Sequence, residues 1–237
     1  MNIICLDNNY LGCARPQQGP AWFLLSHSCL HRDQKPYYVP DWDRDFRAYP
    51  SAAIRIDRLG KGIPARFAER YWDHWTFGFS VRGTETLRAL NEAGLPAGAA
   101  LAFDCCAAIG RWMKADKEQL RRSSFTVETA ATGGETASTG SETTAGAENE
   151  TVARWSFADL ILDADRSIEY VSRFITLKTG DIIFLGFPSE GIRLDRDFKI
   201  NVKRSGPDTE DTISEPFMGF NIRTTAYDGD ILLHHNR

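Results

Sequence analysis

Three acidic side chains at alternate positions are the first candidates for chemistry: Asp41, Asp43 and Asp45. This spacing resembles the start of a calcium-binding loop, where carboxylate oxygens hold a hard cation. Phe46 stands where such a loop needs glycine, and Ala52 stands where it needs a bidentate glutamate. The pattern therefore favours a solvated acidic edge, balanced by the neighbouring Arg44 and Arg47.

A second group has the residue types of a zinc site: His27, Cys29 and His31. On a strand, a spacing of two would place all three side chains on one side. Structural zinc usually needs four nitrogen or sulfur ligands, and only Cys13 is a candidate for the fourth. We therefore expect no zinc site here.

The thiols are the third group, and the chain has five of them: Cys5, Cys13, Cys29, Cys105 and Cys106. Their number is odd and no C-x-x-C pair exists, which indicates reduced thiols in a cytoplasmic protein. Cys105 or Cys106 could act as a nucleophile with His74 or His27 as base. Their neighbours are apolar, however, and burial makes a thiol inert, so we expect core packing. The pair His234 and His235 lies in a polar tail with no expected role.

Composition excludes several classes of function. The 237 residues are 42% hydrophobic and 25% charged, with a formal net charge of -4, so the basic footprint of a nucleic-acid-binding protein is absent. No apolar run approaches the roughly 20 residues of a membrane span. The first ten residues lack the basic region of a signal peptide. We expect a cytoplasmic protein that contacts neither nucleic acid nor membrane.

Many short strands and few helices must position these groups. Expected strands are Ile3–Leu6, Trp22–Leu25, Tyr37–Val39, Ala52–Ile56, Thr76–Val81, a pair within Ala99–Ile109, Ile182–Leu185, Phe198–Val202, Phe217–Ile222 and Ile231–Leu233. Expected helices are Pro64–Trp72, Thr84–Ala93 with Thr84 as its N-cap, and Ser167–Ile175 with Asp163 or Asp165 as its cap. Pro50 predicts a strand start or an edge.

This arrangement predicts one β-rich α+β domain over residues 1–237 with a mixed, rolled sheet. Val127–Thr151 differs from the rest, because it is rich in Thr, Ala, Gly, Ser and Glu and has no lysine, arginine or aromatic residue. Such a segment buries too little apolar surface to offset its ordering entropy. We interpret it as a low-complexity loop inserted between two strands.

The order of these pieces resembles the short, single-domain form of the fumarylacetoacetate hydrolase (FAH) family. The matching segments are Asn9-Tyr10, Phe23-Leu24, KPYYVPD at 35–41, IDRLGK at 56–61, ARFAERY at 65–71, GLP at 94–96, AFD at 102–104 and YVSRFITLKTGDIIF at 170–184. Spacing holds without gaps from Lys35 to about Gly110. The resemblance implies an FAH-type fold, homodimer formation, and relatives that are hydrolases, isomerases or decarboxylases of small keto-diacids.

The resemblance also implies where the functional residues of the family fall. The two glutamates and the aspartate that hold Mg²⁺, Mn²⁺ or Ca²⁺ in the family correspond to Tyr49, Ser51 and Ser80. The family's catalytic histidine, lysine and threonine correspond to Cys13, Leu101 and Phe187. The expected substrate pocket contains Asn9, Tyr10, Leu87 at the position of the family's glutamine, and Asp104. None of the seven family roles keeps its residue type.

Neutral hydroxyls are poor ligands for a hard divalent cation, and without the ion nothing polarises a substrate carbonyl. Leu101 removes a second cationic stabiliser. We therefore predict a pseudoenzyme with no metal cofactor, in a binding or structural role. Two alternatives stay open. One is a Mg²⁺-, Mn²⁺- or Ca²⁺-dependent enzyme acting on C–C bonds of a keto-diacid through relocated ligands such as Asp104 or Glu85. The other is a thiol activity through Cys13.

Overall fold

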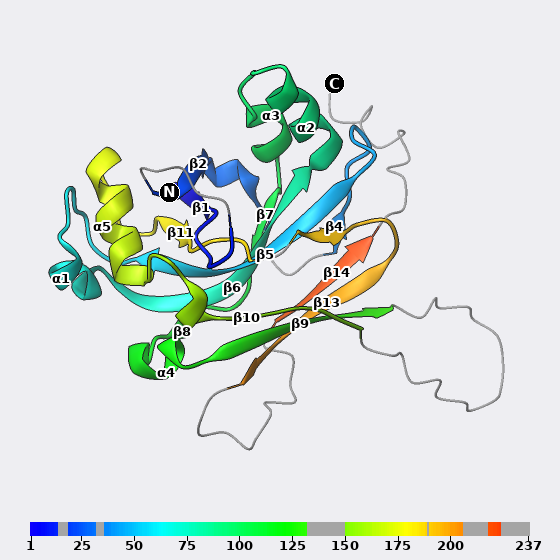
Figure 1. Ribbon diagram of the computed structural model, residues 1–237. Helices are drawn as coiled ribbons and strands as arrows, with labels where there is room; N and C mark the ends of the chain where they lie inside the picture. The colour runs from blue at the N-terminus through cyan, green and yellow to red at the C-terminus, as the bar shows by residue number, and fades with distance from the viewer. Residues whose placement is uncertain (14–18, 32–35, 132–149, 189, 206–217, 224–237) are drawn as a thin grey trace, which may run out of the picture.

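The computed structural model describes residues 1–13, 19–31, 36–131, 150–188, 190–205 and 218–223, and they form two sheets with helices at their margins (Figure 1). The larger sheet has nine strands: β1 (Ile3–Asp7), β2 (Ala21–Leu25), β3 (Leu30–His31), β5 (Phe46–Ile56), β6 (Trp72–Gly83), β7 (Ala107–Ile109), β8 (Met113–Lys114), β11 (Ile182–Phe184) and β12 (Ile192–Arg193). Its main order is β2-β1-β11-β5-β6-β7-β3, with β12 beside β5 and β8 beside β6.

The smaller sheet has five strands in the order β10-β9-β13-β14-β4. They are β4 (Tyr37–Tyr38), β9 (Ser124–Ala131), β10 (Glu150–Ser156), β13 (Phe198–Ser205) and β14 (Met218–Arg223). The helices are α1 (Ala65–Ala68), α2 (Thr84–Glu92), α3 (Gly98–Leu101), α4 (Lys117–Arg121) and α5 (Ala164–Phe174), with 3-10 turns at η1 (His27–Cys29), η2 (Glu69–Tyr71) and η3 (Phe157–Asp159).

Both sheets are mixed, which confirms the predicted α+β class. Strand β1 is parallel to β11 and antiparallel to β2, while β14 is parallel to β4. The long central pair β5 and β6 is antiparallel over eleven residue pairs, from Phe46 opposite Gly83 to Ile56 opposite Trp72. This pair therefore supplies the rigid surface on which the candidate site lies.

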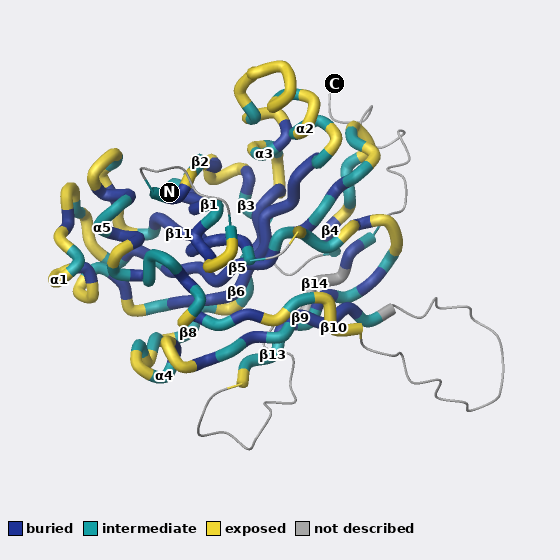
Figure 2. The backbone as a smooth tube through the Cα atoms, in the orientation of Figure 1, coloured by how far each residue is buried: buried dark blue, intermediate teal, exposed yellow. Residues whose placement is uncertain are grey.

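The main core fills the space between the two sheets, where the tube in Figure 2 is dark blue on both sides. Phe77 on β6 and Phe125 on β9 have ring centroids 4.4 Å apart, and Trp75 and Trp155 pack around them. Aromatic pairs in such tilted and edge-to-face arrangements add to the free energy of burial. The opposite face of the larger sheet carries a second, smaller apolar cluster that includes Ala53, Phe184 and Phe187.

The buried side chain of Asn9 links two segments that are far away in the sequence. Asn9 follows β1, and its side-chain amide donates to the carbonyls of Leu162 and Leu185 at 2.9 and 2.6 Å. Its Oδ1 accepts from the Leu162 N–H at 2.9 Å. One side chain thus satisfies backbone groups of two distant segments, which a buried segment requires.

Helix α2 is capped differently from the prediction. Thr84 is its first residue, and the Asp43 carboxylate caps it by accepting a hydrogen bond from the Thr86 N–H at 2.8 Å. Asp43 and Asp45 are half-buried, so the predicted solvated acidic edge holds only for exposed Asp41. The reason is that a helix N-terminus offers unpaired N–H groups, which a carboxylate satisfies better than water does.

Helix α5 begins three residues before the predicted start, and Asp163 is its N-cap, accepting from the Arg166 N–H at 2.9 Å. The predicted helix Pro64–Trp72 is wrong beyond Tyr71. It consists of α1 and η2, and Trp72 starts β6. The cluster of aromatic residues after Ala68 favours the sheet, where Trp72 is buried.

The predicted strand pair within Ala99–Ile109 is also wrong. This stretch forms α3, a turn and β7. Asp104 is exposed, and Cys105 has a φ of 61°. A single strand cannot pass through that left-handed conformation, so the chain turns there.

Two further predictions need correction. Pro50 lies within the central strand β5, in the gap between the residues that pair with β12 and those that pair with β11. Both ends of the predicted loop Val127–Thr151 are strand, because β9 continues to Ala131 and β10 starts at Glu150. Residues 132–149 and the predicted strand Ile231–Leu233 lie outside the described residues.

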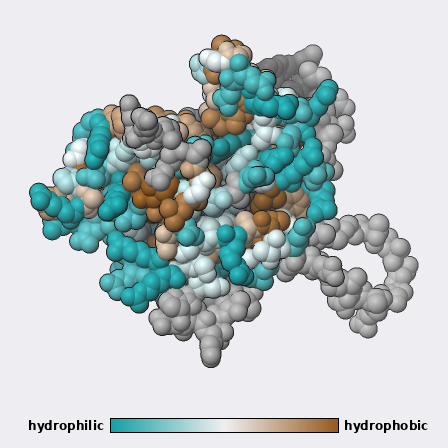
Figure 3. All heavy atoms as spheres, viewed as in Figure 1, coloured by the Kyte–Doolittle hydropathy of each residue, from teal (hydrophilic) through white to brown (hydrophobic). Residues whose placement is uncertain are grey.

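On the face shown in Figure 3, hydrophobic areas lie separately between larger hydrophilic ones. Exposed large hydrophobic side chains include Leu11, Leu24, Leu59 and Phe174. Among the described residues, every helix is too short or too polar to cross a membrane.

Candidate functional site

Three residues that the family resemblance predicts at metal-binding positions lie together on one face of the β5–β6 pair. Tyr49 on β5 is directly opposite Ser80 on β6, and Ser51 is opposite Gly78. Directly opposite residues of antiparallel strands point to the same face. Ser51 and Ser80 are completely buried. The structure thus brings these three predicted positions together.

The two serine hydroxyls differ in their partners. Ser51 Oγ donates to the Ala52 carbonyl at 2.9 Å, while Ser80 Oγ has no hydrogen-bond partner among the described residues. Gly78 between them leaves no spare room, because a Cβ there would lie 2.3 Å from the Ala108 carbonyl oxygen. This part of the face is therefore closely packed against β7.

Tyr49 is half-buried and keeps its phenol proton. Burial raises the pKa of Tyr49, although the positive charges of Arg82 and Arg47 act in the opposite direction. Its ring makes an edge contact with the Phe187 ring at a centroid distance of 6.4 Å. A neutral phenol is a weak ligand for a hard divalent cation.

Arg82 is the residue that sequence reasoning missed. It is two residues after Ser80 on the same strand face, and it is only 6% exposed. Its guanidinium carbon lies 4.3 Å from the Tyr49 ring centroid, 4.5 Å from that of Phe187 and 5.4 Å from that of Phe23. Its Nη1 donates to Asp7 at 3.1 Å. The sequence feature that could have indicated Arg82 is that it is the one charged residue in the run Thr76–Gly83.

Tyr49, Ser51 and Ser80 do not fit a divalent ion. They offer two hydroxyls and a phenol, and a buried guanidinium lies beside them. The nearby carboxylate, Asp7, is already paired with that guanidinium. No group of three or more His, Cys, Asp or Glu side chains with metal-site geometry exists in the part of the chain that the structure describes.

The predicted catalytic positions do not come together. Of these residues, Phe187 lies near Tyr49, because its ring contacts the Tyr49 ring and the Arg82 guanidinium. Leu101 ends α3, where its carbonyl accepts a hydrogen bond from the Cys106 thiol. Cys13 packs, half-buried, against the main core on the other side of the sheet.

The four predicted pocket residues are also dispersed. Asn9 and Tyr10 pack against Gly186, next to Phe187, since a Cβ on Gly186 would lie 3.1 Å from both of their side chains. The amide of Asn9 is fully engaged by backbone groups, as described above. Leu87 is half-buried on α2, and Asp104 is exposed.

The zinc-like group does not share one strand face. His27 and Cys29 are in η1, whereas His31 is in β3. His27 is exposed and Cys29 is buried. The 3-10 turn gives these side chains different directions, so the assumption of a continuous strand was wrong.

The two adjacent thiols have different environments. Cys106 is buried as expected, and burial raises its pKa to about 12, with a further increase from neighbouring Cys29. Cys105 is exposed, which corrects the expectation of core packing. Its pKa is nevertheless raised, first by partial burial and then by the negative charge of Asp104. Neither thiol has the electropositive surroundings of a reactive cysteine.

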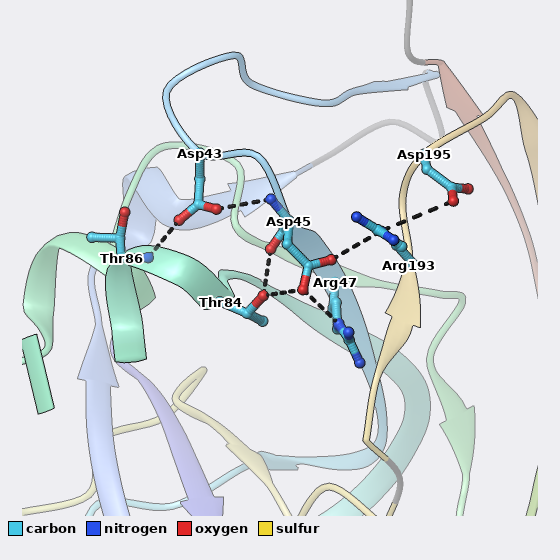
Figure 4. Close-up of polar contacts among 7 residues, drawn as sticks. All are labelled: Asp43, Asp45, Arg47, Thr84, Thr86, Arg193 and Asp195. Carbon is cyan, nitrogen blue, oxygen red and sulfur yellow. Dashed lines mark hydrogen bonds and ion pairs between the residues drawn. The ribbon is translucent and has the colours of Figure 1, made fainter. Parts of the chain in front are cut away.

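A pocket of about 310 Å³ opens beside Tyr49, between β5 and α2. Its lining residues are Asp45, Arg47, Tyr49, Thr84, Glu85 and Arg88. Figure 4 shows how Asp45 organises one wall: it accepts from Thr84 Oγ1 at 2.5 Å and from Arg47 Nε at 3.0 Å, and it pairs with Arg193 at 3.1 Å. Burial alone would raise the pKa of Asp45, but these hydrogen bonds and charges lower it. The acidic group is therefore already neutralised by its neighbours.

The comparisons with known proteins concern the family and the fold. The family model "Fumarylacetoacetate (FAA) hydrolase C-terminal" matches residues 2–215. The chain belongs to the fumarylacetoacetate hydrolase family. An uncharacterized relative from Pyrococcus abyssi is 26% identical over 191 residues, which are 78% of this chain and 77% of the relative.

Solved structures of this family share the fold. Fumarylpyruvate hydrolase from Pseudomonas aeruginosa, in complex with Mn²⁺ and pyruvate, matches with a TM-score of 0.72 and 18% identity, over 94% of this chain and 89% of the other. The 5-carboxymethyl-2-hydroxymuconate delta-isomerase from Mycobacterium smegmatis matches with a TM-score of 0.69 and 19% identity, over 94% and 78%. The predicted FAH-type fold is thereby confirmed, and the family contains both hydrolases and isomerases.

Proposed function

We propose that this member of the FAH family is a pseudoenzyme, which keeps the fold as a binding or structural scaffold and has lost metal-dependent catalysis. The observation that supports this most directly is the set Tyr49, Ser51 and Ser80, which lie together on one face of the β5–β6 pair without a carboxylate among them. Divalent cations need charged oxygen ligands to offset their dehydration. We also propose, from the family resemblance, that the protein is a cytoplasmic homodimer.

The rest of the site supports the same proposal. Phe187 and Leu101 replace polar family residues with apolar ones, and Phe187 lies against the Tyr49 ring. Asn9 serves the fold through its three backbone contacts. Reactions that form an enolate need a positive charge at the developing oxyanion. Arg82, whose guanidinium lies over the Tyr49 ring, is already paired with Asp7.

A direct test is titration with Mn²⁺, Mg²⁺ and Ca²⁺ by calorimetry, followed by assays for C–C hydrolysis, isomerisation and decarboxylation of small keto-diacids. The fumarylpyruvate hydrolase from Pseudomonas aeruginosa, whose structure holds Mn²⁺ and pyruvate, is the matched positive control. We expect no metal binding below about 1 mM and no metal-dependent turnover.

Micromolar binding of any of these ions together with turnover would support the alternative, a metal-dependent enzyme acting on C–C bonds of a keto-diacid. Of the relocated ligands considered for that alternative, Glu85 lines the pocket beside Tyr49, and Asp104 is exposed. Separate substitutions of Glu85 and Asp104 by alanine would then identify the ligand.

A further inference from the structure

Arg82 has the surroundings of a cation-binding site. Three aromatic rings, those of Tyr49, Phe187 and Phe23, lie between 4.3 and 5.4 Å from its guanidinium carbon. Ring faces attract a positive charge at such distances. Asp7 supplies a carboxylate, with Arg82 Nη1 to Asp7 Oδ2 at 3.1 Å. A positive charge is therefore stabilised here by residues from several segments of the chain.

This charge lies beside the positions that the family resemblance assigns to the metal ligands. Arg82 projects from the same face of β6 as Ser80, and its guanidinium contacts the ring of Tyr49. A carboxylate at position 49 would lie within reach of this guanidinium. A divalent cation held by positions 49, 51 and 80 would meet a second, buried positive charge.

We infer that the Arg82 guanidinium permanently takes the place of the divalent ion, so that it both completes the packing of this face and excludes metal. The inference rests on the proposed function and extends it. Loss of the acidic ligands alone would leave a site that three substitutions could restore. If Arg82 occupies the site, restoring those ligands will not restore metal binding while Arg82 is present.

Two variants test the exclusion of metal. The first carries Tyr49→Glu, Ser51→Glu and Ser80→Asp, which restore the family's ligands, and Asp7→Asn, which prevents Asp7 from acting as a ligand. The second adds Arg82→Ala. We expect the second variant to bind Mn²⁺ at least about 100-fold more tightly than the first, since the guanidinium otherwise pairs with the new carboxylates. Equal affinities in two folded variants would overturn the inference.

A stability test in the otherwise unchanged chain guards against misfolding of those variants. Arg82→Met removes the charge with little change in size, whereas Arg82→Lys keeps a cation. Arg88→Met is the control, because Arg88 is exposed on α2. We expect Arg82→Met to lower the midpoint of thermal unfolding by about 5 °C or more, because it leaves Asp7 unpaired. We expect Arg82→Lys to lower it by less than half as much.

An Arg82→Met midpoint equal to that of Arg88→Met would contradict the inference even if the multiple variants do not fold. The two proposals fail differently. Metal binding by the unchanged protein would reject the proposed loss of the metal site. Equal Mn²⁺ affinity with and without Arg82 in the restored variants would reject only the role of this arginine.

Discussion

The carboxylate of Asp43 accepts a hydrogen bond from the backbone N–H of Thr86, although the two residues are 43 positions apart. The same carboxylate accepts from the Asp45 N–H at 2.9 Å. One side chain thus joins the start of β5 to the start of α2, and Figure 4 shows both contacts. The pocket beside Tyr49 lies between these two elements, so its shape depends on this link.

The first prediction concerns that cap. Asp43→Ala should lower the free energy of unfolding by about 1–2 kcal/mol, because it removes the acceptor for the helix N-terminus. Asp41→Ala is the matched control, since Asp41 is exposed. Urea unfolding followed by circular dichroism measures both. Equal stability of the two variants would show that the cap contributes nothing.

The second prediction is a pH dependence. Burial alone would raise the pKa of Asp43, but hydrogen bonds from Asp45, Thr86 and Glu85 lower it below its usual 3.8. A carboxylate with a lowered pKa contributes stability above its unfolded pKa and loses it as the pH falls through the folded value. Stability should therefore decrease below about pH 4, and the decrease should be smaller in Asp43→Ala. Urea midpoints between pH 2.5 and 6 measure this difference.

The third prediction concerns Asn9. Asn9→Ala should lower the free energy of unfolding by about 2–4 kcal/mol, because the Leu162 N–H loses its acceptor and the buried Leu185 carbonyl loses its donor, while the Leu162 carbonyl keeps the hydrogen bond from Ser167 Oγ. Asn91→Ala, at an exposed position of α2, should be neutral or slightly stabilising. A change of less than 0.5 kcal/mol in Asn9→Ala, by denaturant titration, would mean that water replaces the amide there.

The fourth prediction concerns Gly78. A Cβ at this position would lie 2.3 Å from the Ala108 carbonyl oxygen and 2.8 Å from the Phe184 ring, so Gly78→Ala should cost at least about 3 kcal/mol or prevent folding. Gly98→Ala is the control, because nothing lies within 4 Å of its Cβ position. Yield of soluble protein and the thermal midpoint measure the difference.

The fifth prediction concerns the thiols. Burial raises the pKa of Cys106 to about 12, so only about one molecule in 10⁴ carries its thiolate at pH 8. In the native protein, iodoacetamide at pH 8 should modify Cys105 before Cys106. Peptide mapping by mass spectrometry gives the order. Rapid and selective modification of Cys13 would instead support the alternative of a thiol activity.

The sequence predicted most of the strands because their apolar runs are short and bounded by turn residues. Ile3–Leu6, Trp22–Leu25 and Ile182–Leu185 agree with β1, β2 and β11 within one residue. It failed where a distant part of the chain decides local structure. Trp72 is buried in β6, and Pro50 is tolerated in β5 because neither β11 nor β12 pairs with it, although Phe79 of β6 lies opposite it on the other side.

The candidate site shows the same division. Alignment of motifs placed Tyr49, Ser51 and Ser80, and the structure brings them together. The motifs did not indicate Arg82, because its partners come from other segments: Asp7 is the last residue of β1, Phe23 lies in the middle of β2, and Phe187 follows β11. Contacts of this kind depend on strand order, which periodicity does not encode.

The pairing of β1 with β11 has a consequence for synthesis of the chain. Asn2 and Asp181, joined by a hydrogen bond at this pair, are 179 positions apart. At ribosomal rates of 5–20 residues per second, β1 waits roughly 10–35 s before its inner neighbour emerges. During that time β1 has only β2 as a ladder neighbour, so one edge of the apolar segment IICL stays open to chaperones and to aggregation until residue 184 leaves the ribosome.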